Sequence, residues 1–131
     1  QWVKRRDTAY AILWEGTTGV SKPSVEGSSP GRFYHNNTNR GTLGSHTTDW
    51  SYVVTMWDGA YTKAYIDGVE IINSAYTTAN PTVSVFTIAA RNNTSAYNLN
   101  GLVGEVCVYN RALSAGEVEH NFNVQRVRFG K

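Results

Sequence analysis

The chain has 131 residues, 40% of them hydrophobic and 17% charged, which fits one folded domain with its own core. This composition excludes an intrinsically disordered chain, and no apolar run approaches the roughly 20 residues of a membrane-spanning helix. The net charge of +2 does not provide the concentrated positive field that nucleic-acid binding requires, so we expect no nucleic-acid partner.

Short apolar runs bounded by Gly, Pro, Asn and Asp recur along the chain, which is typical of an antiparallel β-sandwich. Strands are predicted over residues 2–4, 9–14, 32–36, 50–57, 62–66, 69–73, 83–89 and 104–109. The segment 16–31 is rich in Gly, Ser, Thr and Pro and predicts a long surface loop. The predicted fold class is all-β, an antiparallel sandwich or jelly roll with one short helix near the C-terminus.

The dipeptide Asp67-Gly68 lies between two alternating runs and predicts a tight hairpin. Both residues tolerate positive φ, and the resulting type I′ turn matches the twist of the strands that it joins. Asp58-Gly59 predicts a second, looser turn. Residues 50–73 are therefore expected to form a three-stranded meander.

The helix is predicted to begin at Ser114. Ser114 and Glu117 have the spacing of a capping box, in which each side chain bonds the backbone amide of the other residue. Val118 and Phe122 lie four residues apart and form one apolar face. We expect two or three helical turns that lean on the sandwich through this face and through Leu113.

The C-terminal residues predict a final edge strand. Val127 and Phe129 alternate there with Arg126 and Arg128. Charged residues at an edge strand prevent it from pairing with another chain, and we assign the arginines this role.

Cys107 is the only cysteine, so the chain forms no internal disulfide and no cysteine-based zinc cluster. Its place between Val106 and Val108 in a predicted strand indicates a buried, unreactive thiol. The three histidines are far apart in the sequence and are expected on loops or the surface: His35, His46 and His120.

Residues 101–114, GLVGEVCVYNRALS, closely resemble the last strand and following turn of laminin-G-like domains of the concanavalin-A-like jelly-roll superfamily. Trp50 followed by a strand and Asp58-Gly59, and then residues 65–68, match in the family's order and spacing. Residues 2–4 resemble the family's opening strand, although its sandwich normally starts at least one strand earlier. We therefore expect residues 1–131 to be a single domain of a longer chain, without its front edge.

Residues 121–130 resemble the tail of laminin-G-like domains at the C-terminal end of tailed-phage virion proteins. This resemblance implies a virion surface, with a role in capsid decoration, a head fibre or a tail fibre. The implied partners are other virion proteins or a cell-surface glycan or protein, and a homo-oligomer is expected because fibres and vertices are symmetric. The alternative is a carbohydrate-binding accessory module of a secreted enzyme or an extracellular adhesion protein.

The sequence predicts a binding module and no enzyme. Glycoside hydrolases of similar fold carry two catalytic carboxylates about 5 Å apart on one strand face. The nearest pair here is Glu117 and Glu119, which would point to different faces of the helix. None of the histidines accompanies a recognisable serine or cysteine nucleophile.

The laminin-G-like domains that this chain resembles often hold calcium at the rim of the sandwich. The ion takes about six to eight oxygen ligands. Turns explain Asp58 and Asp67, so the candidate calcium ligands are Asp49, Asn92 and Asn100.

The loop of residues 91–100 is the candidate ligand site, since its amides can bind hydroxyl groups and its aromatic ring can face a sugar. Its candidate residues are Asn92, Asn93, Tyr97, Asn98 and Asn100. Tyr34 and His35 form a second candidate site. We expect the four tryptophans to pack within the fold and not against a sugar.

Overall fold

The computed structural model describes residues 1–7, 9, 11–17, 24–26, 31–36, 38–44, 47–77, 85–91 and 97–131. Two antiparallel five-stranded sheets face each other, which confirms the predicted all-β sandwich. The first sheet has the order β10 (Gly101–Val103), β1 (Trp2–Arg5), β6 (Trp50–Trp57), β7 (Tyr61–Ile66), β8 (Val69–Ala75). The second has the order β5 (Thr38–Gly44), β4 (Gly31–His35), β3 (Ser24–Glu26), β2 (Ile12–Thr17), β9 (Val85–Ile88).

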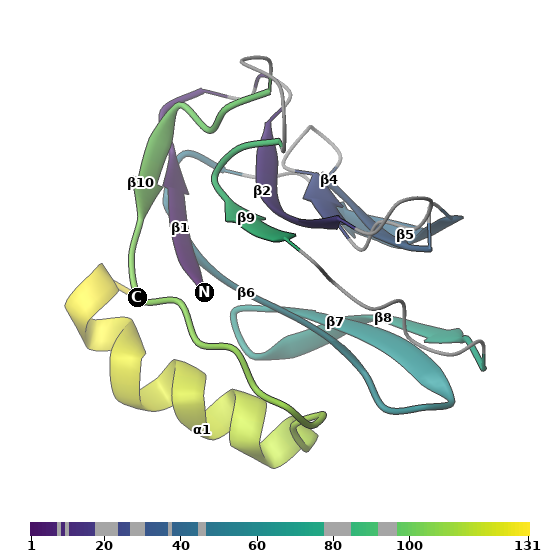
Figure 1. Ribbon diagram of the computed structural model, residues 1–131. Coiled ribbons are helices and arrows are strands. Elements are labelled where there is room, and N and C mark those ends of the chain that lie inside the picture. Colours follow the sequence, from purple (N-terminus) through teal and green to yellow (C-terminus); the bar gives the residue numbers. More distant parts are fainter. Residues whose placement is uncertain are drawn as a thin grey trace.

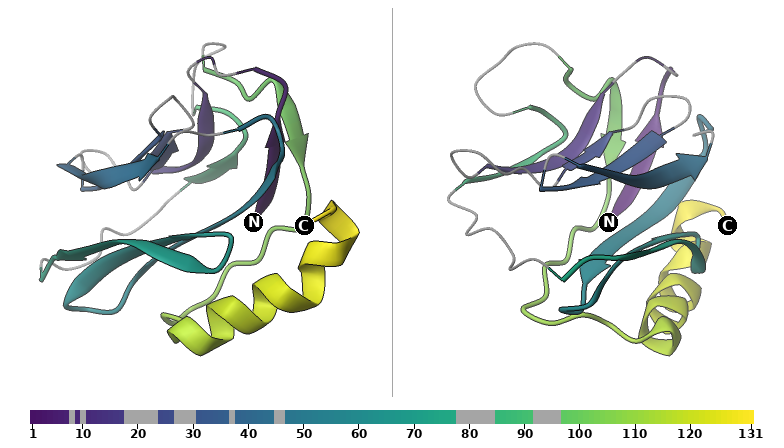
Figure 2. Two further views of the ribbon diagram at one scale, coloured as in Figure 1. Left: turned by 180° about the vertical axis from the view of Figure 1, so that it is seen from behind. Right: turned by 90° about the vertical axis from the view of Figure 1, so that its right-hand side faces the viewer.

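Two apolar clusters hold the layers together. Alternation along each strand directs one set of side chains between the sheets: Val3, Leu13, Val25, Phe33, Leu43, Val53, Ala64 and Ile72. The other set lies between the first sheet and the C-terminal helix: Trp2, Tyr52, Tyr65, Leu113, Val118 and Phe129. Figures 1 and 2 show this helix on the outer side of the first sheet, away from the second sheet.

The predicted meander and its hairpin are confirmed. β6, β7 and β8 are consecutive neighbours in the first sheet. Asp67 and Gly68 both have positive φ, 50° and 86°, as a type I′ turn requires. At the other turn, the Oδ1 atom of Asp58 accepts hydrogen bonds from the backbone amides of Ala60 at 2.9 Å and Tyr61 at 2.7 Å.

Helix α1 (Ala115–Gln125) begins at the predicted capping box. The amide of Glu117 donates to Ser114 Oγ at 3.2 Å, and the amide of Ser114 donates to Glu117 Oε2 at 2.8 Å. Arg111 also donates to this carboxylate, and these hydrogen bonds, with that of Arg111 the largest cause, lower the pKa of Glu117 from its ordinary 4.5 to about 2. Val118 is fully buried and Phe122 packs beside it, as the apolar spacing predicted.

Two strands formed where none was predicted. β3 lies inside the segment that was predicted to be a loop, and β5 has the mostly polar sequence TNRGTLG. Leu43 is the one hydrophobic residue of β5, and it is buried. β5 is an edge strand with one neighbour, so backbone pairing to β4 forms it without the apolar alternation that the prediction required.

Two predicted strands are wrong. Residues 104–109 belong to no sheet, and the strand before them, β10, ends at Val103. The expected C-terminal edge strand is instead a 3₁₀ helix, η1 (Arg126–Phe129). By continuing the helical path, the chain brings Phe129 onto Trp2, with the two ring centroids 4.3 Å apart. Burial of these two rings outweighs the strand alternation of four residues.

Candidate functional site

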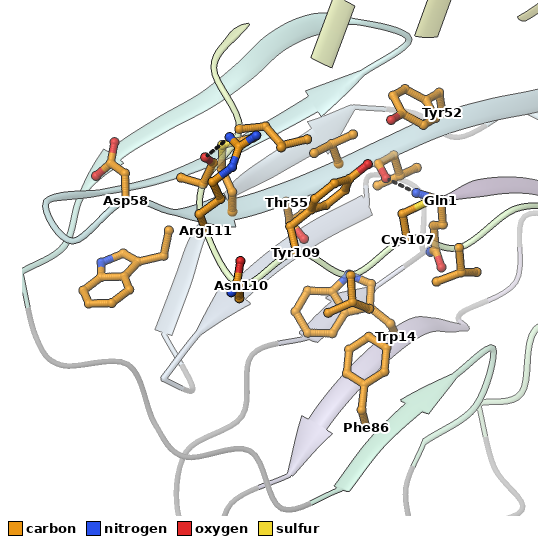
Figure 3. A pocket seen from close by; sticks show the side chains of 18 of the residues that line it. Gln1, Trp14, Tyr52, Thr55, Asp58, Phe86, Cys107, Tyr109, Asn110 and Arg111 are labelled. Atoms are coloured by element: carbon orange, nitrogen blue, oxygen red, sulfur yellow. Dashed lines mark hydrogen bonds between the residues drawn. The ribbon is translucent and has the colours of Figure 1, made fainter. Parts of the chain in front are cut away.

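A cleft of about 670 Å³ lies between strand β6, the edge formed by β2 and β9, and the segment that links β10 to α1 (Figure 3). We call residues 105–113 of this link the strap. One wall of the cleft is therefore a strand of the first sheet, and the other is a chain segment outside both sheets. A concave site of this size is suited to a ligand.

Aromatic rings supply much of the apolar surface of the cleft. Trp14 and Phe86, from neighbouring strands of the second sheet, have their ring centroids 5.5 Å apart. Figure 3 shows the ring of Tyr109, from the strap, in the middle of the cleft. Phe86 is 44% exposed and Tyr109 is 48% exposed, so both rings remain available for contact with a ligand.

The backbone groups of β6 point to its two neighbours in the first sheet, β1 and β7. In an antiparallel pair, successive residues direct their backbone groups alternately to the two sides of the strand. The Asp67 amide donates to the carbonyl of Tyr52 at 2.9 Å, and the Asp58 amide donates to the carbonyl of Tyr61 at 3.1 Å. Even-numbered residues of β6 therefore bond to β7.

The odd-numbered residues of β6 direct their backbone groups toward β1 and the cleft. Val53 exchanges two hydrogen bonds with Gln1, at 2.8 and 2.9 Å. The backbone N–H and C=O groups of Thr55 and Trp57 point to the same side, and both residues line the cleft.

The strap leaves the sheet at its first residue. The amide of Trp2 donates to the carbonyl of Glu105 at 3.1 Å, and no described strand pairs with the strap after that point. Val108 is 76% exposed. The thiol of Cys107 is exposed as well, which corrects the prediction that it is buried in a strand.

The two carboxylates that line the described cleft lie at opposite ends. Glu105 is beside Trp2, at the end where Gln1 pairs with Val53, and Asp58 follows β6 at the other end. Five residues of strand at about 3.4 Å each separate Val53 from Asp58, so the two ends are roughly 17 Å apart. Paired carboxylates of glycoside hydrolases lie within about 5–9.5 Å of each other, and these two do not meet that requirement.

The predicted ligand residues of the loop are only partly brought together. Tyr97 and Asn98 are exposed, and the guanidinium of Arg91 lies 5.5 Å from the centroid of the Tyr97 ring. Asn100 is also exposed and donates from Nδ2 to Asp7 Oδ2 at 2.6 Å. Asn92 and Asn93 lie outside the described residues.

The second predicted ligand pair is separated by strand alternation. Tyr34 is half-buried, whereas His35 is 2% exposed and lies 2.8 Å from Thr62 Oγ1 through its Nδ1 atom. The Tyr76 ring packs on the imidazole with a centroid distance of 4.2 Å. The expectation of a loop or surface position for His35 is therefore wrong. His120 is exposed as predicted, and His46 lies outside the described residues.

The predicted calcium ligands lie on two sides of β1. Asp49 precedes β6 and Asn100 precedes β10, and both are exposed. Because β1 lies between these strands, the two positions are separated by roughly two strand spacings, about 9.6 Å. The third ligand, Asn92, is outside the described residues, and calcium binding stays a prediction. The described part of the chain holds no group of three or more His, Cys, Asp or Glu residues suited to a metal ion.

Alkylation of Cys107 is expected to be slow in spite of its exposure. Desolvation and the hydrogen bond from Sγ to Glu105 Oε1, at 3.3 Å, raise the pKa of the thiol above its ordinary 9.0. Since the thiolate is the reactive form, iodoacetamide should modify the folded domain several-fold more slowly at pH 8 than the urea-unfolded chain.

The control for this prediction is Glu105→Gln, which removes the carboxylate charge and should speed the reaction of the folded domain. The difference between folded and unfolded chains should also shrink as the pH rises past the raised pKa. Equal rates for the folded and unfolded chains at pH 8 would contradict the prediction. Mass spectrometry of the alkylated chain provides the rates.

The cleft could not be predicted from the sequence. Trp14, Phe86 and Tyr109 are far apart in the chain and were each assigned to predicted strands, with no local signal that they share a wall.

The two-sheet sandwich with its outer helix and open cleft defines a jelly-roll binding domain. The family model of laminin-G-like domains, described as the concanavalin A-like lectin/glucanases superfamily, matches residues 2–119, and the chain belongs to this family. No curated protein and no solved structure matches the chain. Domains of this family bind carbohydrates or proteins. In the described residues, no helix has the length and apolar character needed to cross a bilayer.

Proposed function

We propose that this domain is a non-enzymatic binding module on the surface of a virion, and that it contacts a partner protein through the cleft. The partner is a neighbouring virion protein or a protein of the host surface. The observation that carries the binding role is the cleft itself, whose wall holds the exposed aromatic rings of Phe86 and Tyr109. Its two carboxylates are too far apart to act as a hydrolytic pair.

The exposed apolar side chains of the cleft favour a protein over a sugar. A sugar ring needs polar side chains that bond its hydroxyl groups beside an aromatic face, whereas the exposed side chains of this wall include Phe86, Val108 and Tyr109. Exposed aromatic and aliphatic side chains gathered at one site are typical of a protein-binding surface. The virion setting is supported by the resemblance of residues 121–130 to the tail of phage virion proteins.

A glycan is the second candidate ligand, at the rim and not in the cleft. Tyr97 is exposed and is followed in the chain by the exposed Asn98 and Asn100, and an aromatic ring combined with side-chain amides suits a sugar. The secreted or extracellular accessory module is the corresponding alternative setting.

Immunogold labelling of purified particles, with antibodies raised against the domain, tests the setting. We expect gold on the surface of intact particles. Label confined to the secreted fraction would support the extracellular alternative. The same domain, incubated with polysaccharides of the host surface, should release no new reducing ends if it is not an enzyme.

A glycan array tests the second ligand and the metal together, once with calcium and once with a chelator. Our proposal of a protein partner predicts no glycan binding in either condition. Binding that is lost with the chelator would instead establish a calcium lectin and assign Asp49, Asn92 and Asn100 as candidate ligands. Binding that is unaffected by the chelator would establish a metal-independent lectin.

A further inference from the structure

Asn100 and Gly101 form the one Asn-Gly dipeptide of the sequence. In such a dipeptide the backbone nitrogen of the glycine can attack the side-chain amide of the asparagine, because the glycine has no side chain that obstructs the approach. The product is a cyclic succinimide, which water opens to aspartate or isoaspartate. In a folded protein the reaction depends on the exposure of the asparagine, on the hydrogen bonds of the attacking nitrogen and on local opening of the backbone.

Asn100 is accessible and lies directly before strand β10, which runs beside β1 (Figure 1). Its side chain is exposed, and Nδ2 donates to Asp7 Oδ2 at 2.6 Å. Its backbone carbonyl accepts a hydrogen bond from the amide of Arg6 at 2.8 Å. Asn100 is therefore held at the end of a strand pair, where water reaches it and where local opening requires the least free energy.

The backbone nitrogen of Gly101 is not used in the ladder with β1. The amide of Arg6 donates to the carbonyl of Asn100, and the amide of Gly104 donates to the carbonyl of Trp2 at 2.8 Å. Backbone groups alternate between the two sides of an antiparallel strand, so the even-numbered residues here bond to β1 and the amide of Gly101 points to the opposite side. Ring closure at this nitrogen therefore breaks no hydrogen bond between Gly101 and β1.

The packing of β10 on β1 requires glycine at position 101. A Cβ atom there would overlap the carbonyl oxygen of Lys4 and lie 3.1 Å from Cα of Arg5. A residue with a side chain would slow ring closure, but the neighbouring backbone leaves no room for one. The fold thus keeps beside Asn100 the residue that makes an asparagine most reactive.

We infer that Asn100 is a site of spontaneous deamidation in the folded domain, and that the reaction replaces its hydrogen bond to Asp7 with a repulsion between two carboxylates. The nitrogen of Gly101 loses its proton and forms a bond to Cγ of Asn100. The bond from Cγ to Nδ2 breaks, and the side-chain nitrogen leaves as ammonia. Water then adds to one of the two succinimide carbonyl carbons and gives aspartate or isoaspartate, with no oxidant, reductant or enzyme.

Asp7 is the residue that responds to this change. The hydrogen bond from Asn100 is the largest cause of the lowered pKa of the Asp7 carboxyl. Its other oxygen, Oδ1, accepts from the amide of Ala9 at 3.0 Å and lies 4.0 Å from the guanidinium of Arg5. A carboxylate at position 100 removes the donor to Oδ2 and brings a second negative charge to it. An isoaspartate also lengthens the backbone where β10 begins, so both products should weaken the pairing of β10 with β1.

Peptide mapping by mass spectrometry measures the reaction in the purified domain during incubation in mildly alkaline buffer. Asn100 should deamidate at least about tenfold faster than Asn98, because glycine places no Cβ beside the attacking nitrogen. Asn98 is the matched control, since it is exposed, lies in the same segment and precedes Leu99. A free peptide of residues 97–104 should react no more than about tenfold faster than the domain, because the end of a strand pair opens readily.

Two variants test the consequence for the fold. Asn100→Asp reproduces the aspartate product and should lower the Tm by about 1–4 °C, the effect of like charges facing each other across a strand pair. The double variant Asp7→Asn with Asn100→Asp restores one amide and one carboxylate with their positions exchanged, and it should recover most of the lost Tm. Circular dichroism shows that both variants are folded before their Tm values are compared.

Four results would overturn the inference. Asn100 could stay unmodified in the domain while the free peptide reacts completely, or Asn98 could react as fast as Asn100. Either result would exclude a preferred deamidation site at Asn100. An unchanged Tm for Asn100→Asp, or a loss of Tm that persists in the double variant, would exclude the repulsion with Asp7.

Discussion

Substitution of Trp2 by alanine is expected to destabilise the domain by about 3–5 kcal/mol, the range for removal of a large buried aromatic side chain. Trp2 has no exposed surface and packs against Phe129, Tyr52 and Phe122, with ring centroids 4.3, 5.2 and 5.8 Å away. Its indole Nε1 also donates to Gln125 Oε1 at 2.6 Å. The loss should leave a cavity between the first sheet and the helix. Urea unfolding followed by circular dichroism measures the change in the free energy of unfolding.

The matched control for Trp2→Ala is Val127→Ala. Val127 lies in η1, beside the same cluster, but is 80% exposed. Its truncation should change the free energy of unfolding by no more than about 0.5 kcal/mol. If Trp2→Ala cost as little as this, the aromatic cluster would not be what holds the helix to the sheet.

Two glycine-to-alanine substitutions should have effects of opposite sign. A Cβ atom at Gly101 would overlap the carbonyl oxygen of Lys4 and lie 3.1 Å from Cα of Arg5, both backbone atoms of the neighbouring strand. Backbone cannot move aside as a side chain can, so Gly101→Ala should destabilise the domain by about 3 kcal/mol, the upper part of the range for overpacking. Thermal unfolding of the variant, compared with the unaltered domain, measures this effect.

The matched substitution Gly116→Ala lies in the first turn of α1. No atom approaches within 4 Å of the position of its Cβ. Alanine restricts the unfolded chain and favours the helix, so this variant should be more stable by roughly 0.5–1 kcal/mol. A loss of stability at Gly116, or none at Gly101, would contradict the packing of these two elements.

Several features could be predicted from the sequence because each depends on a few neighbouring residues. The Asp67-Gly68 turn follows from two residues that tolerate positive φ, and the start of α1 follows from two side chains, Ser114 and Glu117, that cap each other. The all-β class likewise follows from short apolar runs that are bounded by Gly, Pro, Asn and Asp. None of these features requires knowledge of a distant part of the chain.

The prediction of a strand over residues 104–109 shows the limit of such reasoning. The local composition favours a strand, but a strand forms only when a second backbone satisfies its donors and acceptors. Here residues 106–109 have no ladder partner among the described strands.

His35 and Phe129 were misplaced for a related reason. The local pattern predicted a loop or surface position for His35 and an edge strand for Phe129. Burial against residues far away in the sequence places both side chains in the interior instead. His35 is enclosed by Thr62 and Tyr76, and Phe129 by Trp2. Contacts of this kind contribute more free energy than four residues of strand alternation.

The sequence by itself thus determined the class of fold, the meander, its turns and the capped helix. The tertiary structure alone decided which strands have two neighbours, which aromatic rings share the cleft and which predicted site residues are accessible. The physical reason is the range of the interactions. Turns and caps are closed by hydrogen bonds between residues two or three positions apart, whereas ladders and cores are closed by groups that the whole fold brings together.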